Sequence, residues 1–369
     1  MAYLAVVAFL AIVAGCQGAA IFGTFTPQVK QGVFTNMNYW LGQADSGAGP
    51  QQALRIVEVG WQAPDPTTGH IAAIDDIRNA WGWSGAVPIV TWMPYGYKTW
   101  TSSTPNDDIV SGVYDDYIDA FLSQLRDRFV FEPNAVIKRL YLRFAPQPNG
   151  DWFPWSPFCP GCASNGQHIN QTAASYKAMW QYVLSKVRDP KYNFTADTVQ
   201  IVFDAATFSA SGPVENFAPP SDLVHWFVMT GINWGNTLPG NSWVTPTQLF
   251  GSTLASLQAI AGGKPIGIAS AGSTSVPKGV EGKSTWLTQL CTFVTTNGLK
   301  MMTYHNADSS TDVAVFGGSV GPGNFSSPVD AAWFRMYPAF RDCVAGPGFH
   351  GRNQTDPRYL SDAQFAGTS

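Results

Sequence analysis

Short apolar runs and amphipathic stretches alternate along this chain. Runs of strand length and strand-forming composition are Ala53–Trp61, Val87–Trp92, Ala135–Arg143, Val199–Phe203, Val224–Thr230, Pro265–Ala269 and Leu299–Tyr304. Apolar residues at helical spacing predict helices over Ile71–Trp81, Ile109–Phe131, Ser175–Val187, Pro246–Ile260, Trp286–Thr295 and Ala331–Phe340. Six or seven consecutive strand–helix units without a linker predict an α/β fold, a single-domain (β/α)8 TIM barrel.

The loop after each predicted strand is polar or aromatic. A doubly wound sheet normally carries a Gly-rich nucleotide loop after an early strand, and this chain has none. In a barrel the carboxyl ends of the strands meet on one face, where active sites lie. That face would carry Trp61, Trp92, Tyr95, Gln147, Asn149, Trp152, Asp204, Asn233, Trp234, Ser270 and His305.

The richest of these loops is the stretch 143–155, with the sequence RFAPQPNGDWFPW. Pro146 and Pro148 cannot donate to a sheet, so the preceding strand must end there. Guanidinium, amide, carboxylate and indole groups then follow within a few residues. Such groups supply hydrogen bonds and flat apolar faces, which suit an uncharged, polyhydroxylated ligand such as a sugar.

Composition agrees with a neutral partner. Charged residues make up 12% of the 369 residues, against about 25% in average proteins, and 14 residues are Trp. Lys and Arg number 21 and Asp and Glu 25, a formal net charge of −4, and no basic block is present. We therefore predict no nucleic-acid partner, and expect a secreted, extracellular monomer that faces a neutral polymer.

The N-terminal residues 1–20 are apolar and end in small residues, which predicts a cleaved signal peptide. The alternative is a lipoprotein signal with attachment at Cys16, which would tether the protein to a membrane. The barrel would then span 21–345, with 346–369 as a C-terminal tail. Four Asn-x-Ser/Thr triplets favour N-glycosylation, at Asn170, Asn193, Asn324 and Asn353.

Four cysteines remain after the signal. In an oxidising compartment this even count predicts two disulfides, Cys159 with Cys162 and Cys291 with Cys343. A redox motif or half a zinc site is the alternative for the Cys-Pro-Gly-Cys segment. His225 and His305 lack partners at metal-ligand spacing, so we predict no metal and no cofactor.

Several motifs together resemble glycoside hydrolase family 26, which comprises secreted β-mannanases and related endo-glycanases. These motifs are RFAPQPNGDWFPW, GINWGN, GKPIGIASAGS and the TWMPYG loop, and the resemblance covers roughly residues 21–342. It implies a (β/α)8 barrel that cleaves β-mannan or another β-glycan with two glutamates about 5–5.5 Å apart. It also implies substrate-binding roles for Arg143, Asn149, Trp152, Asn233 and Trp234. We predict the same role for Trp155, Trp92 and Trp61, whose alternative is packing in the core or at the barrel rim.

The residues at the two glutamate positions depart from the family pattern. Gln147 stands where the resemblance places the acid/base glutamate, and Ser270 where it places the nucleophile. Gln has no proton to transfer, a loss of about 10²–10⁴ in rate. Ser270 needs an adjacent base to act as a nucleophile, and no Ser–His pair is evident. We therefore expect a catalytically impaired barrel, a pseudoenzyme that still binds a β-glycan, with β-mannan favoured.

Two further hypotheses stay open. In the first, an active endo-β-glycanase uses a relocated carboxylate, with Asp204, Glu58 and Asp151 as candidates. Each of these carboxylates also has a purely structural interpretation. Asp204 would cap a helix or bond to a loop, and Glu58 would pair with Arg55 or Arg143. Asp151 would order its own loop. In the second, the protein is a structural or cell-wall glycoprotein that binds no glycan, and the tryptophans serve only in packing.

Overall fold

The computed structural model describes residues 18–27, 33–43, 49–95, 104–164, 167–318 and 335–369. Eight parallel strands form its centre: β1 (Ala20–Phe25), β2 (Leu54–Gly60), β3 (Val87–Met93), β4 (Leu140–Phe144), β7 (Val199–Ala206), β8 (Trp226–Asn233), β9 (Ile266–Ser273) and β10 (Met301–His305). Each strand pairs with its neighbour in chain order, and β10 pairs with β1 to close the sheet. The prediction of a (β/α)8 barrel is confirmed.

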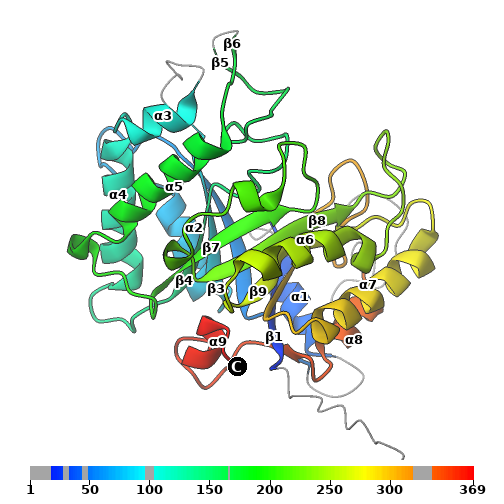
Figure 1. Cartoon of the computed structure of the whole chain (residues 1–369). Coiled ribbons are helices and arrows are strands. Elements are labelled where there is room, and N and C mark those ends of the chain that lie inside the picture. The colour runs from blue at the N-terminus through cyan, green and yellow to red at the C-terminus, as the bar shows by residue number, and fades with distance from the viewer. Residues whose placement is uncertain (1–17, 28–32, 44–48, 96–103, 165–166, 319–334) are drawn as a thin grey trace, which may run out of the picture.

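Helices surround this barrel (Figure 1). They are α1 (Val33–Leu41), α2 (Ala73–Gly82), α3 (Pro105–Val110), α4 (Asp115–Leu125), α5 (Ala173–Val187), α6 (Pro246–Ile260), α7 (Gly279–Thr296), α8 (Pro338–Val344) and α9 (Asp362–Ala366). A π-helical turn (Arg126–Val130) follows α4. A hairpin of β5 (Ala163–Ser164) and β6 (Gln167–His168) precedes α5. Near the end of the chain, β11 (Phe349–His350) pairs with β1. No helix within these described ranges is both long and apolar enough to cross a membrane.

Several predicted boundaries were wrong. The region after β1, for which no helix was predicted, contains α1, whose buried residues Val33, Met37 and Trp40 have helical spacing. The helix predicted over 109–131 divides near Gly112, whose φ of 85° lies in the left-handed region that only glycine adopts readily. The strand predicted from 135 begins at Leu140, and the closing helix over 331–340 begins at Pro338; its first four predicted positions, 331–334, lie outside the described residues.

The chain termini contribute to the barrel. β1 starts at Ala20, the last residue of the predicted signal peptide, while residues 1–17, Cys16 included, lie outside the described residues. The segment 346–369, predicted as a tail, packs against the amino ends of the strands. Tyr141 donates a hydrogen bond of 3.0 Å to the carbonyl of Phe365, whose ring centroid lies 4.8 Å from that of Tyr141. Arg139 forms an ion pair with Asp362 in α9.

Both predicted disulfides are present. Cys159 pairs with Cys162 at a Cα–Cα distance of 5.2 Å, in the connection between β4 and α5. Cys291 in α7 pairs with Cys343 in α8 at 6.0 Å and joins the last two helices of the outer ring. These links stabilise the fold because they restrict the unfolded chain.

A buried lysine holds the loop that follows β10. Lys283 on α7 is fully buried, and its ammonium group donates to the carbonyl oxygens of Val313 at 2.9 Å and Ala314 at 3.0 Å. The same group lies 4.5 Å from the ring centroid of Tyr337, a cation–π distance. Burial lowers the pKa of Lys283 to about 7, although the nearby Asp312 acts in the opposite direction. The loop is therefore fixed at the carboxyl end of β10, next to His305.

Candidate functional site

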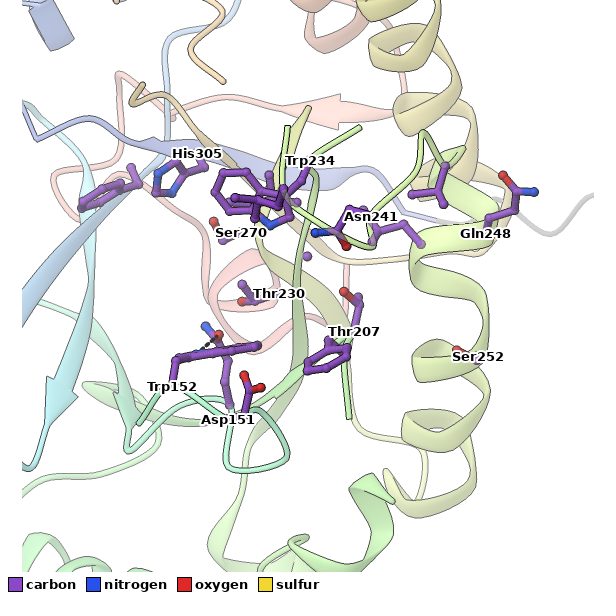
Figure 2. Close-up of a pocket in the computed structure, with 18 of the residues that line it drawn as sticks. Asp151, Trp152, Thr207, Thr230, Trp234, Asn241, Gln248, Ser252, Ser270 and His305 are labelled. Atoms are coloured by element: carbon purple, nitrogen blue, oxygen red, sulfur yellow. Dashed lines mark hydrogen bonds between the residues drawn. The ribbon is translucent and has the colours of Figure 1, made fainter. Parts of the chain in front are cut away.

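A cavity of about 780 Å³ opens at the carboxyl ends of the strands (Figure 2). Its side facing the barrel axis is lined from β1, β2, β4, β8, β9 and β10 by Phe25, Ile56, Glu58, Arg143, Thr230, Ile232, Ser270 and His305. The remaining wall comes from the loops after β4, β7 and β8 and from α6. This is the face on which barrel enzymes place their active sites, and the volume is typical of small-molecule sites, roughly 300–1,000 Å³.

A buried ion pair lies at the bottom of this cavity. Arg143 Nη1 is 3.3 Å from Asp204 Oδ2, and Arg143 Nε donates to Thr91 Oγ1 at 2.9 Å. The Thr230 hydroxyl lies 3.0 Å from both carboxylate oxygens of Asp204. Burial raises the pKa of Asp204 to about 6, although Arg143 and the hydrogen bonds from Thr230 and Gln147 oppose the rise. Asp204 is only 1% exposed and does not line the cavity.

Gln147 connects this ion pair to the cavity wall. Its side-chain Nε2 donates to Asp204 Oδ2 at 3.4 Å, and its Oε1 accepts from the indole N–H of Trp152 at 3.1 Å. Its backbone is left-handed, with φ of 58°, and its backbone N–H donates to the carbonyl of Asp204 at 2.8 Å. Ala145 is also left-handed, with φ of 43°. Such conformations cost about 1–3 kcal/mol each and cluster at functional sites.

Trp152 presents a flat apolar face to the cavity. Its side chain is 42% exposed, and its ring lies 6.2 Å from that of Phe208 at an interplanar angle of 22°. A Cβ atom at Gly150 would lie 2.7 Å from the indole, so any other residue there would displace the indole from this position. Figure 2 shows Trp152 across the cavity from Trp234, with Thr230 between them.

Other predicted site residues have structural roles. Trp61, Trp92 and Trp155 are buried in the core; Trp155 donates to the carbonyl of Pro146 at 2.8 Å, and Trp92 stacks on an aromatic residue of α4. Asn149 is fully buried and exchanges two hydrogen bonds of 2.8 Å with the backbone of Ala206. None of these four residues, for which direct substrate contact was predicted, lines the cavity.

Asn233 is also buried, and its side chain shapes the loop after β8. Its Oδ1 accepts from the backbone N–H of Gly235 at 3.2 Å and of Val244 at 3.1 Å, and its Nδ2 donates to the Ser273 hydroxyl at 2.9 Å. Asn233 therefore fixes both ends of this loop. It positions the cavity wall and does not itself line the cavity.

The three candidate carboxylates converge on this site. Glu58 and Asp151 line the cavity, and Asp204 lies behind Gln147. The predicted pairing of Glu58 with Arg55 or Arg143 is wrong within the described part of the chain, because Arg55 donates to Ser84 and Arg143 pairs with Asp204. Among these same residues no cluster of His, Cys, Asp and Glu is arranged to hold a metal ion.

Ser270 and His305 also line the cavity, from neighbouring strands. The Ser270 hydroxyl makes no hydrogen bond to any described residue, so it is available to a ligand. β9 has an extra residue at this point relative to β8, a bulge of the kind that redirects a side chain near a site. Burial, with a smaller effect from the positive charge of Arg143, lowers the pKa of His305 to about 4, so its imidazole is neutral at pH 7.

Comparisons with known proteins fit this architecture. No family model matches the chain. The catalytic domain of the endo-β-1,4-mannanase of glycoside hydrolase family 26 from Bacillus sp. JAMB-750 superimposes with a TM-score of 0.60 at 14% identity, over 90% of this chain and 87% of that one. The chain has a family 26-like barrel fold. A ruminal family 26 endo-β-1,4-mannanase gives 0.52 at 13% identity, over 91% and 65% of the two chains.

Two further relatives are also glycan hydrolases by name. A family 5 lichenase from Caldicellulosiruptor sp. F32 superimposes with a TM-score of 0.54 at 9% identity, over 80% of each chain. By sequence, Endoglucanase H of Acetivibrio thermocellus is 23% identical over 270 residues. That match covers 69% of this chain but only 27% of the relative's length. The cavity of this family 26-like barrel lies at the carboxyl ends of its strands.

Sequence reasoning missed part of the cavity lining. Thr230 was placed inside a strand without a role, and no site role was predicted for Leu238, Asn241, Ser242, Gln248 or Ser252. Nothing in the local sequence marks Gln248 and Ser252 as site residues, because they are ordinary polar residues on a helix surface. Only the packing of α6 beside the barrel mouth brings them to the site.

Proposed function

We propose that this family 26-like barrel is a secreted protein that binds a β-linked glycan, with β-mannan favoured, and does not hydrolyse it by the two-glutamate mechanism. The observation that carries this proposal is the engagement of Gln147 at both ends of its amide, to Asp204 and to Trp152. A glutamine held in this way forms part of a binding wall and has no proton to give to a glycosidic oxygen.

Ser270 supports the same conclusion. For a serine to attack a sugar, a base must remove its proton, and the Ser270 hydroxyl has no hydrogen-bonded base within the described chain. His305 on the next strand is held neutral at pH 7 but is not hydrogen-bonded to Ser270. A free serine hydroxyl can instead donate to and accept from a sugar hydroxyl.

The rest of the cavity suits a neutral carbohydrate. Trp152 and Trp234 offer apolar faces to the C–H surface of a sugar ring, while Arg143, Thr230 and Ser270 offer hydrogen bonds. Because Arg143 is paired with Asp204 and His305 is neutral, the cavity has little uncompensated positive charge to attract an acidic ligand.

Secretion is part of the proposal. Two disulfides form readily only in an oxidising compartment. The candidate glycosylation sites Asn170 and Asn193 are exposed, Asn353 is partly exposed, and Asn324 lies outside the described residues. We propose an extracellular monomer, with lipid attachment at Cys16 as the alternative.

A second candidate is an active endo-β-glycanase with relocated carboxylates. The observation that favours it is that Glu58 and Asp151 both line the cavity, and that Asp204, with a pKa raised to about 6, lies close behind. Two carboxyl groups in different environments are what glycoside hydrolysis requires.

Binding and hydrolysis can be separated in one set of assays. Reducing-end release from β-mannan, mixed-linkage glucan and xylan would be followed over several hours, and affinity for the same oligosaccharides would be measured by calorimetry. We expect no hydrolysis and saturable binding. Trp152→Ala should lower the affinity about tenfold or more, the size expected of a buried aromatic contact. Trp83→Ala is the matched control, because Trp83 is 76% exposed and lies outside the cavity.

Gln147→Glu with Ser270→Glu tests the interpretation of the two substituted positions. If they correspond to the family glutamates, the double variant should gain measurable hydrolysis. Hydrolysis by the natural protein that disappears in Glu58→Gln or Asp151→Asn would instead establish the second candidate. Absence of any saturable glycan binding would leave the structural glycoprotein as the remaining hypothesis.

A further inference from the structure

A small cavity lies at the amino ends of β4 and β7, on the opposite side of the barrel from the candidate site. Its volume is about 250 Å³. Leu140 at the start of β4 pairs with Val199 at the start of β7, and the Leu140 N–H donates to the carbonyl of Thr198 at 2.9 Å. This pairing brings the loop before β4 against the turn before β7. The residues that line the cavity include Phe131, Ile137, Asn193, Thr195, Asp197 and Arg358.

The loop before β4 exposes apolar side chains. Ala135, Val136 and Ile137 are three consecutive exposed residues, and Ile137 is 51% exposed. A run of this kind is unfavourable in water unless another group covers it. The cavity beside it is smaller than the roughly 300–1,000 Å³ of most small-molecule sites. A covering group that is held there by a covalent bond fits this size better than a freely diffusing ligand.

Asn193 supplies a point of attachment in the wall of this cavity. It belongs to an Asn-Phe-Thr triplet and ends the 3₁₀ turn Pro190–Tyr192, with a left-handed φ of 56°. Its side chain is exposed, and its amide makes no hydrogen bond to any residue in the described part of the chain. Its Nδ2 can therefore carry an N-linked sugar without the loss of a contact within the fold.

The other groups of the cavity match the first sugar of such a glycan, an N-acetylglucosamine. Phe131 and Ile137 offer apolar surface to the acetyl methyl group and to the C–H face of the ring. The Asp197 carboxylate is exposed and unpaired among the described residues, so it can accept from the acetamide N–H or from a hydroxyl. Arg358, which is partly exposed, can donate to the acetyl carbonyl. Attachment at Asn193 gives the sugar a high effective concentration, so weak contacts suffice.

We propose that Asn193 carries an N-linked glycan whose first N-acetylglucosamine packs on Ile137 and Phe131 and completes the fold at the amino ends of β4 and β7. The inference rests on the proposed secretion and is independent of glycan binding at the barrel mouth. The oligosaccharide comes from a lipid diphosphate donor. The bond from its anomeric carbon to the diphosphate oxygen breaks, the bond to Asn193 Nδ2 forms, and one Nδ2 proton leaves with the lipid diphosphate.

The test uses protein secreted from a yeast host and trimmed by an endoglycosidase to one N-acetylglucosamine per site. Peptide mass spectrometry would measure the occupancy of Asn193, and urea unfolding would measure stability. Thr195→Val removes the triplet and Thr195→Ser keeps it. The hydroxyl of Thr195 is exposed and makes no hydrogen bond within the described ranges. Asn193 itself stays in place, because its left-handed backbone favours Asn over Gln. Asn170→Gln is the matched control, since Asn170 is exposed but does not line this cavity.

We expect Asn193 to be occupied in the natural protein and in Thr195→Ser. Thr195→Val should lose the sugar and raise the equilibrium constant for unfolding about fivefold, the effect of exposing roughly half of an isoleucine side chain again. Asn170→Gln should leave that constant unchanged. In an Ile137→Ser background, loss of the sugar at Asn193 should have less than a twofold effect, because the apolar surface that it covers is gone.

Three results would decide against the inference. A secreted protein with Asn193 unmodified would overturn it, and so would equal stability of Thr195→Val and Thr195→Ser; in both cases the proposed secretion stands. An undiminished effect of the sugar in the Ile137→Ser background would refute the packing on Ile137. Retention of the natural protein inside the host, without any sugar, would overturn the proposed secretion together with this inference.

Discussion

Asp204 offers a quantitative test of the electrostatics of the site. Its carboxylate is buried and accepts hydrogen bonds from Thr230, Arg143 and Gln147, yet burial dominates and raises its pKa from 3.8 to about 6. Asp204→Asn keeps the size of the side chain and removes the titration. The variant should therefore change how the free energy of unfolding depends on pH.

The direction follows from the raised pKa. Because the folded protein holds this proton more tightly than the unfolded chain does, the proton stabilises the fold fully below pH 3.8. That stabilisation is lost as the pH rises through about 6. A shift of about two pKa units at about 1.36 kcal/mol each corresponds to about 2–3 kcal/mol. Relative to Asp204→Asn, the natural protein should lose this amount between about pH 4 and pH 7.

Urea unfolding of both proteins from pH 4 to 7.5 would measure the difference. His225 and His305, whose pKa values burial lowers to about 4, act in the opposite direction and gain stability as the pH rises. Both proteins contain these histidines, so their effects cancel in the difference. Thr230→Val serves as a second variant: it removes a hydrogen bond that lowers the pKa of Asp204, so the loss of stability should move to higher pH.

Two results would refute the reasoning. A difference that stays constant with pH would show that Arg143 keeps Asp204 ionised at an ordinary pKa. A natural protein that gains stability over Asp204→Asn as the pH rises would show that the pKa is depressed instead, with the ion pair outweighing burial.

Two further predictions concern stability. Cys291→Ser with Cys343→Ser should lower the free energy of unfolding by about 4 kcal/mol, since the link closes a loop of 52 residues; an equal midpoint of urea unfolding in the double variant would contradict this. Lys283→Met should cost about 3–5 kcal/mol, because it leaves the carbonyl groups of Asp312 and Ala314 buried without their donor and removes one of the two cations beside the Asp312 carboxylate. Lys278→Met is the control for the latter, since Lys278 is exposed and its removal should cost less than about 1 kcal/mol.

The amino-acid sequence determined the order and type of most barrel elements. Strand runs such as Val199–Phe203 are apolar at every position except Gln200 because parallel strands are buried on both faces, and this pattern needs no tertiary information. Thr245 and Pro246 marked the start of α6 for equally local reasons, a side-chain cap and a proline at the first helical position. The cysteine pairing followed from count and spacing. Even α1, which was missed, shows helical spacing in Val33, Met37 and Trp40.

Only the tertiary structure decided which side chains of the strand-end loops face the cavity. Trp152 and Trp155 belong to one loop, yet the first is 42% exposed and the second is buried. Asn149 bonds to the backbone of a strand 57 residues away, and Gln147 touches Asp204 at the same separation. The part of the cavity that Gln248 and Ser252 line likewise exists because α6 packs beside the barrel mouth. Local sequence determines which backbone conformation each segment prefers. The cavity wall consists of segments far apart in the sequence, and these come into contact only when the barrel closes.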